Sequence, residues 1–200
     1  MNTMTRFAMG FFVAISALGL SANAQVRKGD VGECRICHTE NGHYGNRFAP
    51  RLEGQLEKYF ISEMKAYRSH SRFGDSAKTY MWGFAEENSD ADFVKMAKWF
   101  AAAKPGAGIP GDPELIKRGQ DIYQNGIPGR VDSCADCHGV NAEGSGGMPR
   151  LAGQFAGYLN SQMAEYIKGT VKEAKFMPDI AVQLTESETA AVSEYLQSMD

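Results

Sequence analysis

Apolar side chains recur at helical spacing along this chain, and the same arrangement occurs twice. In each occurrence they fall at positions i, i+3, i+4, i+8 and i+11, which places them on one face of a helix. The first set comprises Leu56, Tyr59, Phe60, Met64 and Tyr67. The second set lies 99 positions later and comprises Phe155, Tyr158, Leu159, Met163 and Tyr166. The spacing predicts amphipathic helices over residues 55–69 and 154–168.

Each half of the chain also carries a signal for the start of a last helix. Ser89 and Thr185 precede further apolar positions at helical spacing, and both are residue types favoured at an N-cap. Residues 185–188, Thr-Glu-Ser-Glu, have the form of a capping box. Asp112 followed by Pro113 predicts another helix start, for a helix that runs to about Gln124. No alternating pattern of useful length predicts a strand, so the expected fold class is all-α.

The repeat extends beyond the helices and divides the chain into two domains. Pro-Arg-Leu-Glu-Gly-Gln at 50–55 returns as Pro-Arg-Leu-Ala-Gly-Gln at 149–154, and Met81 aligns with Met177 at a shorter offset of 96. Glycine and proline dominate the stretch between the halves, which is typical of a linker. We expect a first domain at 25–103, a linker at 104–112 and a second domain at 113–200.

The first residues have the character of an export signal. Arg6 precedes an apolar run, and Ala-Asn-Ala at 22–24 has the small-residue form of a cleavage site. We expect a signal peptide at 1–24 that is cleaved on export to the periplasm, with an uncleaved membrane anchor as the alternative. The net charge of −3, without a block of Lys and Arg, argues against nucleic acid and anionic membrane surfaces as partners.

The chemistry is carried by two copies of the motif Cys-x-x-Cys-His, one hundred positions apart. The copies comprise Cys34, Cys37 and His38, and Cys134, Cys137 and His138. Thiols one helical turn apart can each form a thioether with the same porphyrin, and the adjacent histidine can bind the iron as its proximal ligand. A structural zinc site or two disulfides are alternatives, but neither explains a histidine after each cysteine pair. The motifs predict two covalently attached c-type haems.

The ligand on the opposite side of each iron is predicted to be a methionine. Met81 and Met177 each lie in a predicted loop, eight positions before the capped last helix, where a thioether could reach the iron. Met64 and Met163 also align with each other, but their positions inside predicted helices favour a packing role.

Three further residues could lie near an iron and are assigned to other roles. Met148 has no methionine counterpart in the first half and is expected at a haem edge. His43 and His70 occur only in the first half and are expected at the surface. If one of these histidines replaced Met81, the first haem would have two histidine ligands and a lower reduction potential.

With these motifs the chain resembles class I c-type cytochromes and, among them, the dihaem cytochrome c4 family. The resemblance covers nearly all of the chain after the export signal. Besides the haem motifs and the two Pro-Arg-Leu-x-Gly-Gln stretches, it includes Gly-Gln-Asp-Ile-Tyr at 119–123 and Cys-His-Gly-Val-Asn-Ala-Glu-Gly at 137–144. It implies two tandem class I cytochrome c-like domains, packed face to face and each wrapped around a covalently bound haem. It also implies an electron shuttle that catalyses no reaction on its own.

One departure from the family keeps an alternative open. Only residues 25–33 precede Cys34, whereas a full predicted helix precedes Cys134. The cytochrome subunits of periplasmic flavin-dependent sulfide dehydrogenases are also dihaem proteins with an abbreviated first domain, and the chain resembles them in this respect.

The resemblance further implies roles for residues that follow each haem motif. The carbonyls of Pro50 and Pro149 would accept the N–H of the proximal imidazole. The guanidinium groups of the next residues, Arg51 and Arg150, would suit pairing with haem propionates, and the hydroxyls of Tyr59 and Tyr158 could contact the same groups. A solvent-facing side chain is the alternative for the arginines, and helix packing is the alternative for the tyrosines.

Three functions fit these expectations. The first is a free shuttle between quinol-cytochrome c reductase and a haem-copper terminal oxidase, loosely associated with the membrane through these partners. The second is the electron-accepting subunit of a periplasmic dehydrogenase, for example a flavoprotein sulfide dehydrogenase. The third is an enzyme, such as a dihaem peroxidase or a thiosulfate dehydrogenase. An enzyme needs an open or labile iron position, and the methionine in each half argues against one, so we expect a carrier.

Overall fold

The computed structural model describes residues 31–38 and 48–200, and the predicted signal peptide at 1–24 and His43 lie outside these ranges. The described residues form helices and three isolated β-bridges but no strand, so the predicted all-α class is confirmed. Within the described residues, no helix is long and apolar enough to cross a membrane.

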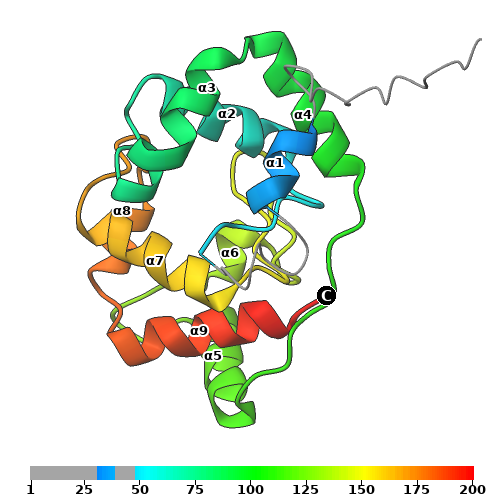
Figure 1. Ribbon diagram of the computed structural model, residues 1–200. Helices are drawn as coiled ribbons and strands as arrows, with labels where there is room; N and C mark the ends of the chain where they lie inside the picture. Colours follow the sequence, from blue (N-terminus) through cyan, green and yellow to red (C-terminus); the bar gives the residue numbers. More distant parts are fainter. Residues whose placement is uncertain (1–30, 39–47) are drawn as a thin grey trace, which may run out of the picture.

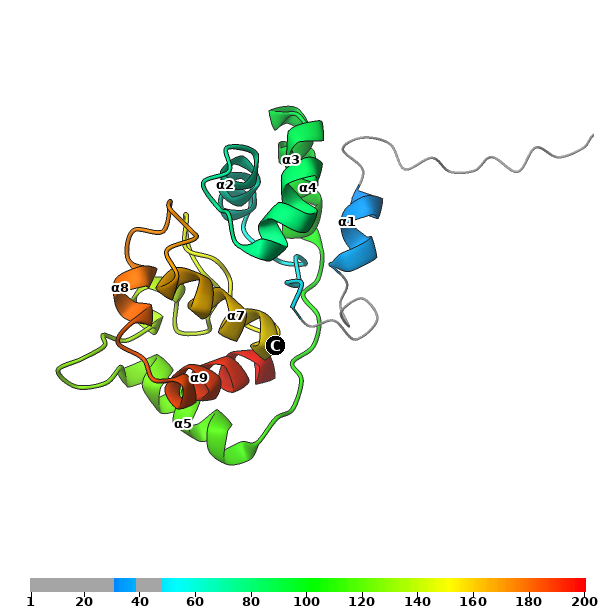
Figure 2. The ribbon, with the colours of Figure 1, turned by 60° about the vertical axis from the view of Figure 1, so that its left-hand side comes forward.

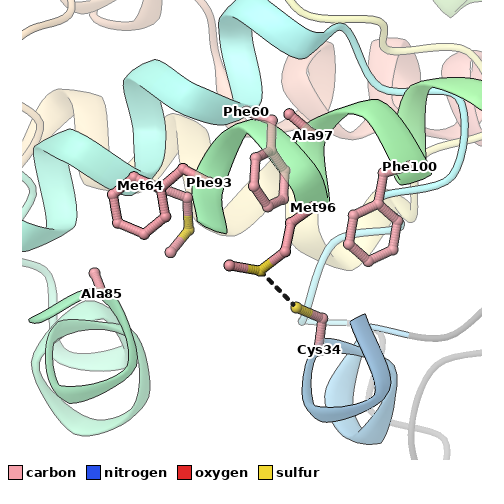
Figure 3. Close-up of a cluster of buried hydrophobic side chains, with 8 residues drawn as sticks. All are labelled: Cys34, Phe60, Met64, Ala85, Phe93, Met96, Ala97 and Phe100. Atoms are coloured by element: carbon pink, nitrogen blue, oxygen red, sulfur yellow. Dashed lines mark hydrogen bonds between the residues drawn. The ribbon is translucent and has the colours of Figure 1, made fainter. Parts of the chain in front are cut away.

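The helices of the first half enclose one cluster of buried side chains. They are α1 (Val31–Cys37), α2 (Glu57–Arg68), the π-helix η1 (Ala77–Met81), α3 (Trp82–Glu87) and α4 (Asp90–Ala102). Figure 3 shows this cluster, in which Phe60 and Met64 of α2 face Phe93, Met96 and Phe100 of α4. Each of these side chains is at most 5% exposed, so α2 and α4 form the framework of the first half.

The second half has its own cluster and one more long helix. Its elements are α5 (Pro113–Asn125), α6 (Ala135–His138), α7 (Ala156–Ile167), α8 (Met177–Ala181) and α9 (Glu186–Ser198). Tyr123, Leu159, Tyr195 and Leu196 meet in its buried core. Figures 1 and 2 show the two groups of helices side by side, joined by the chain between α4 and α5.

The helices predicted from apolar spacing and capping residues are confirmed. Those expected at 55–69 and 154–168 are α2 and α7, each shorter by a few residues at its start and by one at its end. Ser89 and Thr185 each accept a hydrogen bond from the backbone N–H three positions later, and both helix starts are full capping boxes. Asp112 caps α5, with Pro113 as its first residue. These signals are local in sequence, which is why they could be read without the tertiary structure.

The prediction that both candidate methionine ligands lie in loops is wrong. Met81 is the last residue of η1, and Met177 is the first residue of α8. Pro178 lies in the first turn of α8, where its missing N–H costs no helical hydrogen bond. The chain therefore presents each methionine from a short helical turn, which fixes its backbone more closely than a loop would.

The halves differ in how their last helix is covered. In the second half α5 crosses α9 so closely that a Cβ added at Gly119 would lie 1.9 Å from the carbonyl oxygen of Ala191. The described part of the first half contains no counterpart of α5. As a result Trp99 of α4 is 41% exposed, whereas Tyr195, its equivalent in the repeat, is 8% exposed.

Two side-chain amides join the halves in a reciprocal way. The side chain of Gln154 accepts from the backbone N–H of Arg51 at 2.9 Å and donates to the carbonyl of Arg51 at 3.0 Å. The side chain of Gln55 makes the same pair of bonds with Arg150, at 2.9 and 3.1 Å. Both glutamines are buried. Because each partner is the repeat equivalent of the other, the halves are related by an approximate twofold axis.

A second contact lies on the same approximate axis. Arg72 and Val171, which are also 99 positions apart, face each other in an isolated antiparallel bridge. The N–H of Phe73 donates to the carbonyl of Thr170 at 2.9 Å, and the N–H of Lys172 donates to the carbonyl of Ser71 at 3.0 Å. The halves are therefore connected through backbone groups at two places, which defines their relative orientation.

The contact between α5 and α9 gives a first testable prediction. Gly119→Ala should lower the free energy of unfolding by about 1–3 kcal/mol, because the added methyl group collides with the backbone of α9. Gly83→Ala in α3 is the matched control, since no atom lies within 4 Å of its added Cβ. That variant should be as stable as the wild type or gain up to about 1 kcal/mol. Denaturant titration of the haem-loaded proteins measures both, and equal effects would contradict the close crossing.

Candidate haem sites

The first Cys-x-x-Cys-His motif is presented by α1. Cys34 is 8% exposed and points toward α4, where its Sγ lies 3.7 Å from Sδ of Met96 (Figure 3). Cys37 follows one turn later and is exposed. The N–H of His38 donates to the carbonyl of Cys34 at 2.8 Å, which extends the helical turn to the histidine. The two thiols therefore lie one turn apart, as attachment to a single porphyrin requires.

The second motif lies on α6, and neighbouring groups hold it in place. The N–H of His138 donates to the carbonyl of Cys134 at 3.0 Å, so the turn is built as in the first half. The hydroxyl of Tyr123 in α5 donates to the carbonyl of Gly139, just after the motif, at 2.6 Å. Burial raises the pKa of the free Cys134 thiol to about 11, so the sulfur is protonated at neutral pH before a haem is attached.

The alternatives of a zinc site and of paired disulfides find no support in the geometry. All four cysteines lie in the described part of the chain, and no disulfide joins them. In that part of the chain, no group of three or more His, Cys, Asp or Glu side chains is placed to hold a metal ion. Structural zinc is bound by thiolates that converge on one point. Here the two cysteine pairs lie in separate halves.

Each histidine is held in the form that binds haem iron. Nδ1 of His38 lies 2.8 Å from the carbonyl oxygen of Pro50, and Nδ1 of His138 lies 3.1 Å from that of Pro149. A carbonyl oxygen can only accept, so Nδ1 carries the proton and Nε2 has its lone pair available. Burial lowers the pKa of both histidines, while the hydrogen bond to proline acts in the opposite direction. Both predicted proline contacts are confirmed, and both imidazoles fit the proximal position of a haem.

The candidate methionines, Met81 and Met177, are both partly buried. Met81 is partly buried and packs against the same buried cluster as Cys34. Met177 is also partly buried, at the start of α8. Met64 is 3% exposed inside the first core, in agreement with a packing role, and Met163 lies partly buried on α7.

His70 lies at the surface of the first half. Its ring stacks on that of Trp82 with centroids 3.7 Å apart, and its Nε2 lies 2.6 Å from a carboxylate oxygen of Glu86. The side chain of His70 is 44% exposed. The expectation of a surface histidine is confirmed for His70, and the stacked ring covers the residue that follows Met81.

Arg51 and Arg150 align in the repeat but have different surroundings. Nη1 of Arg51 donates to the carbonyls of Ala107, in the predicted linker, and Gly153, in the second half, at 2.9 and 2.6 Å. Its guanidinium also lies over the ring of Phe155, 4.6 Å from the centroid. Nη2 of Arg150 donates to the carbonyl of Asp200 at 2.9 Å, while its Nε is buried without a partner. Arg51 thus connects the halves, and Arg150 keeps a donor for a further acceptor.

The sequence did not predict a cluster of polar side chains that lies between the halves. Arg72 is 8% exposed and bonds to Glu63 of its own half and to Gln162 of the other half. Nη2 of Arg72 also lies 3.4 Å from the hydroxyl of Tyr158. Nε2 of Gln162 is a buried donor without a partner. The sequence feature that could have pointed to this cluster is the repeat, because it aligns Glu63 with Gln162.

Tyr59 and Tyr158, which were predicted to contact haem propionates, belong to this cluster. Burial raises the pKa of Tyr59 well above its usual value, and the charge of Glu63 adds to the effect. The hydroxyl of Tyr158 donates to the side-chain oxygen of Gln162 at 3.3 Å. Tyrosine hydroxyls and the unpartnered N–H groups of Arg150 and Gln162 are donors suited to carboxylates. The residues between the halves therefore fit a haem, whose propionates are carboxylates.

Comparisons with known proteins agree with this chemistry. The family model described as Cytochrome c matches residues 116–200. Cytochrome c-552 of Acidithiobacillus ferridurans is 33% identical over 93% of this chain and 81% of that protein. Cytochrome c4 of Thiocapsa roseopersicina is 31% identical over 84% of this chain and 88% of that protein. A thiosulfate dehydrogenase electron acceptor of Thiomonas intermedia is 29% identical over 84% of this chain and 78% of that protein.

A solved structure extends the similarity to the arrangement of both halves. The structure of cytochrome c4 from Acidithiobacillus ferrooxidans matches with a TM-score of 0.77 at 32% identity. The match covers 84% of this chain and 99% of that chain, so it includes helices of both halves.

The unequal surroundings of the two arginines give a second prediction. Arg51→Ala should lower the free energy of unfolding by about 3 kcal/mol, because it removes two charged hydrogen bonds to the linker and the second half. Arg150→Ala should cost less stability but lower one of the two reduction potentials, because a positive charge beside a haem favours the reduced state. Denaturant titration and redox titration of both variants provide the comparison. Equal losses of stability would contradict the assignment of Arg51 to the junction of the halves.

Proposed function

Because the chain belongs to the cytochrome c4 family, it carries two covalently bound c-type haems and transfers electrons, and we propose that each Cys-x-x-Cys-His motif attaches one of them. Cys34 and Cys37 would hold the first haem, and Cys134 and Cys137 the second. The observation that carries the proposal is the pair of imidazoles, each with Nδ1 hydrogen-bonded to a proline carbonyl. The predicted domains at 25–103 and 113–200 would then each contain a complete attachment motif.

We further propose that Met81 and Met177 bind the sixth position of the two irons. Met81 packs on the buried cluster that also contains Cys34, which supports its placement near the first haem. Met177 aligns with it in the repeat and lies at the start of a short helix in the same relation to the last helix. A haem with histidine and methionine ligands changes oxidation state by one electron and has no open position for oxygen or peroxide. This ligand set supports a carrier that is not an enzyme.

We propose that the protein carries electrons in the periplasm, from quinol-cytochrome c reductase to a haem-copper terminal oxidase. The predicted export signal at 1–24 supports this location, because c-type haems of such proteins are attached outside the cytoplasm. Redox proteins are its partners, and association with the membrane would be loose and mediated by them. Two haems, one in each half, would let an electron enter through one half and leave through the other.

A second candidate function is supported by relatives described as thiosulfate dehydrogenase electron acceptors. The thiosulfate dehydrogenase electron acceptor of Thiomonas intermedia is similar to both halves of this chain. By analogy, this protein would accept electrons from a periplasmic dehydrogenase of a small reductant and pass them on. The two functions differ in the electron donor and not in the haem chemistry.

Rapid mixing with the two kinds of donor separates these functions. The oxidised protein is mixed with quinol-cytochrome c reductase and quinol, or with thiosulfate dehydrogenase and thiosulfate. The proposed shuttle should be reduced by the first pair at least about ten times faster, and a haem-copper oxidase should reoxidise it. Faster reduction by the dehydrogenase, or purification from the native source in complex with one, would select the second function.

Substitution of the two proposed axial methionines gives a third prediction. Met81→His and Met177→His should each lower one of the two reduction potentials, because a methionine ligand raises the potential of haem relative to histidine. Redox titration should resolve two waves in the wild type, and each variant should move a different one. Met64→Leu and Met163→Leu are matched controls on α2 and α7 that should leave both waves in place. A bis-histidine spectrum in the wild type would contradict the methionine assignment.

A further inference from the structure

The peptide groups that follow Pro50 and Pro149 each have both of their polar atoms in hydrogen bonds. In the first half this is the group between Pro50 and Arg51. Its carbonyl oxygen faces Nδ1 of His38 at 2.8 Å, and its N–H donates to the side chain of Gln154 at 2.9 Å. The histidine belongs to the first half and the glutamine to the second. A single rigid peptide plane therefore connects the proximal histidine of one half to a side chain of the other.

The same connection exists in the opposite direction. The carbonyl between Pro149 and Arg150 lies 3.1 Å from Nδ1 of His138, and the N–H of that peptide group donates to Gln55 at 2.9 Å. Each glutamine also donates to the carbonyl of the same arginine, at 3.1 and 3.0 Å. These carbonyls belong to the next peptide group along the chain, so each glutamine bonds to both peptide groups that flank the arginine.

The glutamines are held so that this contact is rigid. Gln55 is 6% exposed and Gln154 is 5% exposed. The side-chain oxygen of Gln55 also accepts from the N–H of Leu56 at 2.9 Å, and that of Gln154 accepts from the N–H of Phe155 at 3.0 Å. These N–H groups lie at the starts of α2 and α7. Both amides are therefore anchored to a long helix of their own half.

Hydrogen bonds at the two ends of one peptide group strengthen each other. An acceptor on the N–H polarises the amide and places more negative charge on its carbonyl oxygen. A more negative carbonyl binds the Nδ1–H of the imidazole more strongly and makes Nε2 a more basic ligand. A more basic ligand stabilises ferric iron over ferrous iron and lowers the reduction potential.

We propose that each of these glutamines is a positioning residue for the iron-binding histidine of the other half. Gln154 acts on His38, and Gln55 acts on His138. The orientation and basicity of each proximal ligand are then set across the junction of the halves. This inference rests on the proposed function only in that it takes both histidines as iron ligands.

The test uses the fact that each glutamine is connected to the histidine of the other half and not to that of its own half. Gln154→Met and Gln55→Met keep the volume of the side chain but remove the acceptor and the donor. In the reduced protein with both haems, the Nδ1–H of each proximal histidine is observed by proton NMR. Gln154→Met should make exchange of the His38 Nδ1–H with solvent about fivefold faster, as expected for losing about 1 kcal/mol of hydrogen bonding. The exchange of the His138 Nδ1–H should stay as in the wild type.

Gln55→Met should give the mirror result. His138 should exchange faster, and His38 should stay unchanged. Redox titration adds a second readout, in which each variant raises one of the two potentials and the two variants move different waves. Gln120→Met, at an exposed position of α5, is the matched control and should change neither histidine nor either potential.

The outcomes distinguish glutamines that position the histidines from glutamines that only hold the two halves together. If the glutamines only held the halves together, each variant would affect both histidines alike, and that result would overturn the inference. An effect confined to the histidine of the glutamine's own half, or no effect on either, would overturn it as well. Failure of the proposed function gives a different result, because a histidine that does not bind iron shows no haem ring-current shift of its Nδ1–H signal.

Discussion

The hydrogen bonds from Nδ1 of His38 and His138 to proline carbonyls are the contacts on which both candidate haem sites depend. They fix the tautomer, so that the lone pair of Nε2 is directed away from the protein backbone and is free for iron. They also require the chain to return beside the ring only 12 residues after His38 and 11 after His138. Proline suits this position because it has no N–H that would need a partner. The next residue, an arginine in both halves, is then placed at the junction.

The approximate twofold relation explains why the halves are so alike and where they must differ. A shared axis brings equivalent residues face to face, as in the bridge between Arg72 and Val171. Away from the axis each half must cover its own last helix. The second half uses α5, whereas in the described part of the first half α4 is left with Trp99 partly exposed. The guanidinium of Arg35, in the first haem motif, lies 5.7 Å from the ring of Trp99. In the first half, the motif itself thus covers part of the face that α5 would occupy.

Sequence reasoning predicted the features that depend on neighbouring residues and missed those that join distant ones. The caps at Ser89, Asp112 and Thr185 and the helices α2 and α7 were predictable because a few adjacent side chains determine them. The haem motifs were predictable because their chemistry requires one fixed spacing. The loop placement of the methionines was wrong because a short helical turn leaves no long apolar period in the sequence. The repeated Gln55 and Gln154 were visible as a match, but their partners in the opposite half lie about 100 positions away and no local pattern reveals them.

The reciprocal hydrogen bonds between the glutamines and the arginines restrict motion of one half relative to the other. Four side-chain hydrogen bonds join Gln55 and Gln154 to the opposite arginines, and each contributes about 0.5–1.5 kcal/mol to stability. Together these contributions amount to a few kcal/mol, a large fraction of the stability of a small domain. Separating the halves would also leave buried amide groups without partners, which adds the cost of unsatisfied donors and acceptors. Because two of these bonds end on the peptide groups that contact His38 and His138, the halves cannot separate without disturbing the surroundings of both histidines. A carrier built in this way would keep His38 and His138, the proposed iron ligands, fixed relative to each other while its partners change.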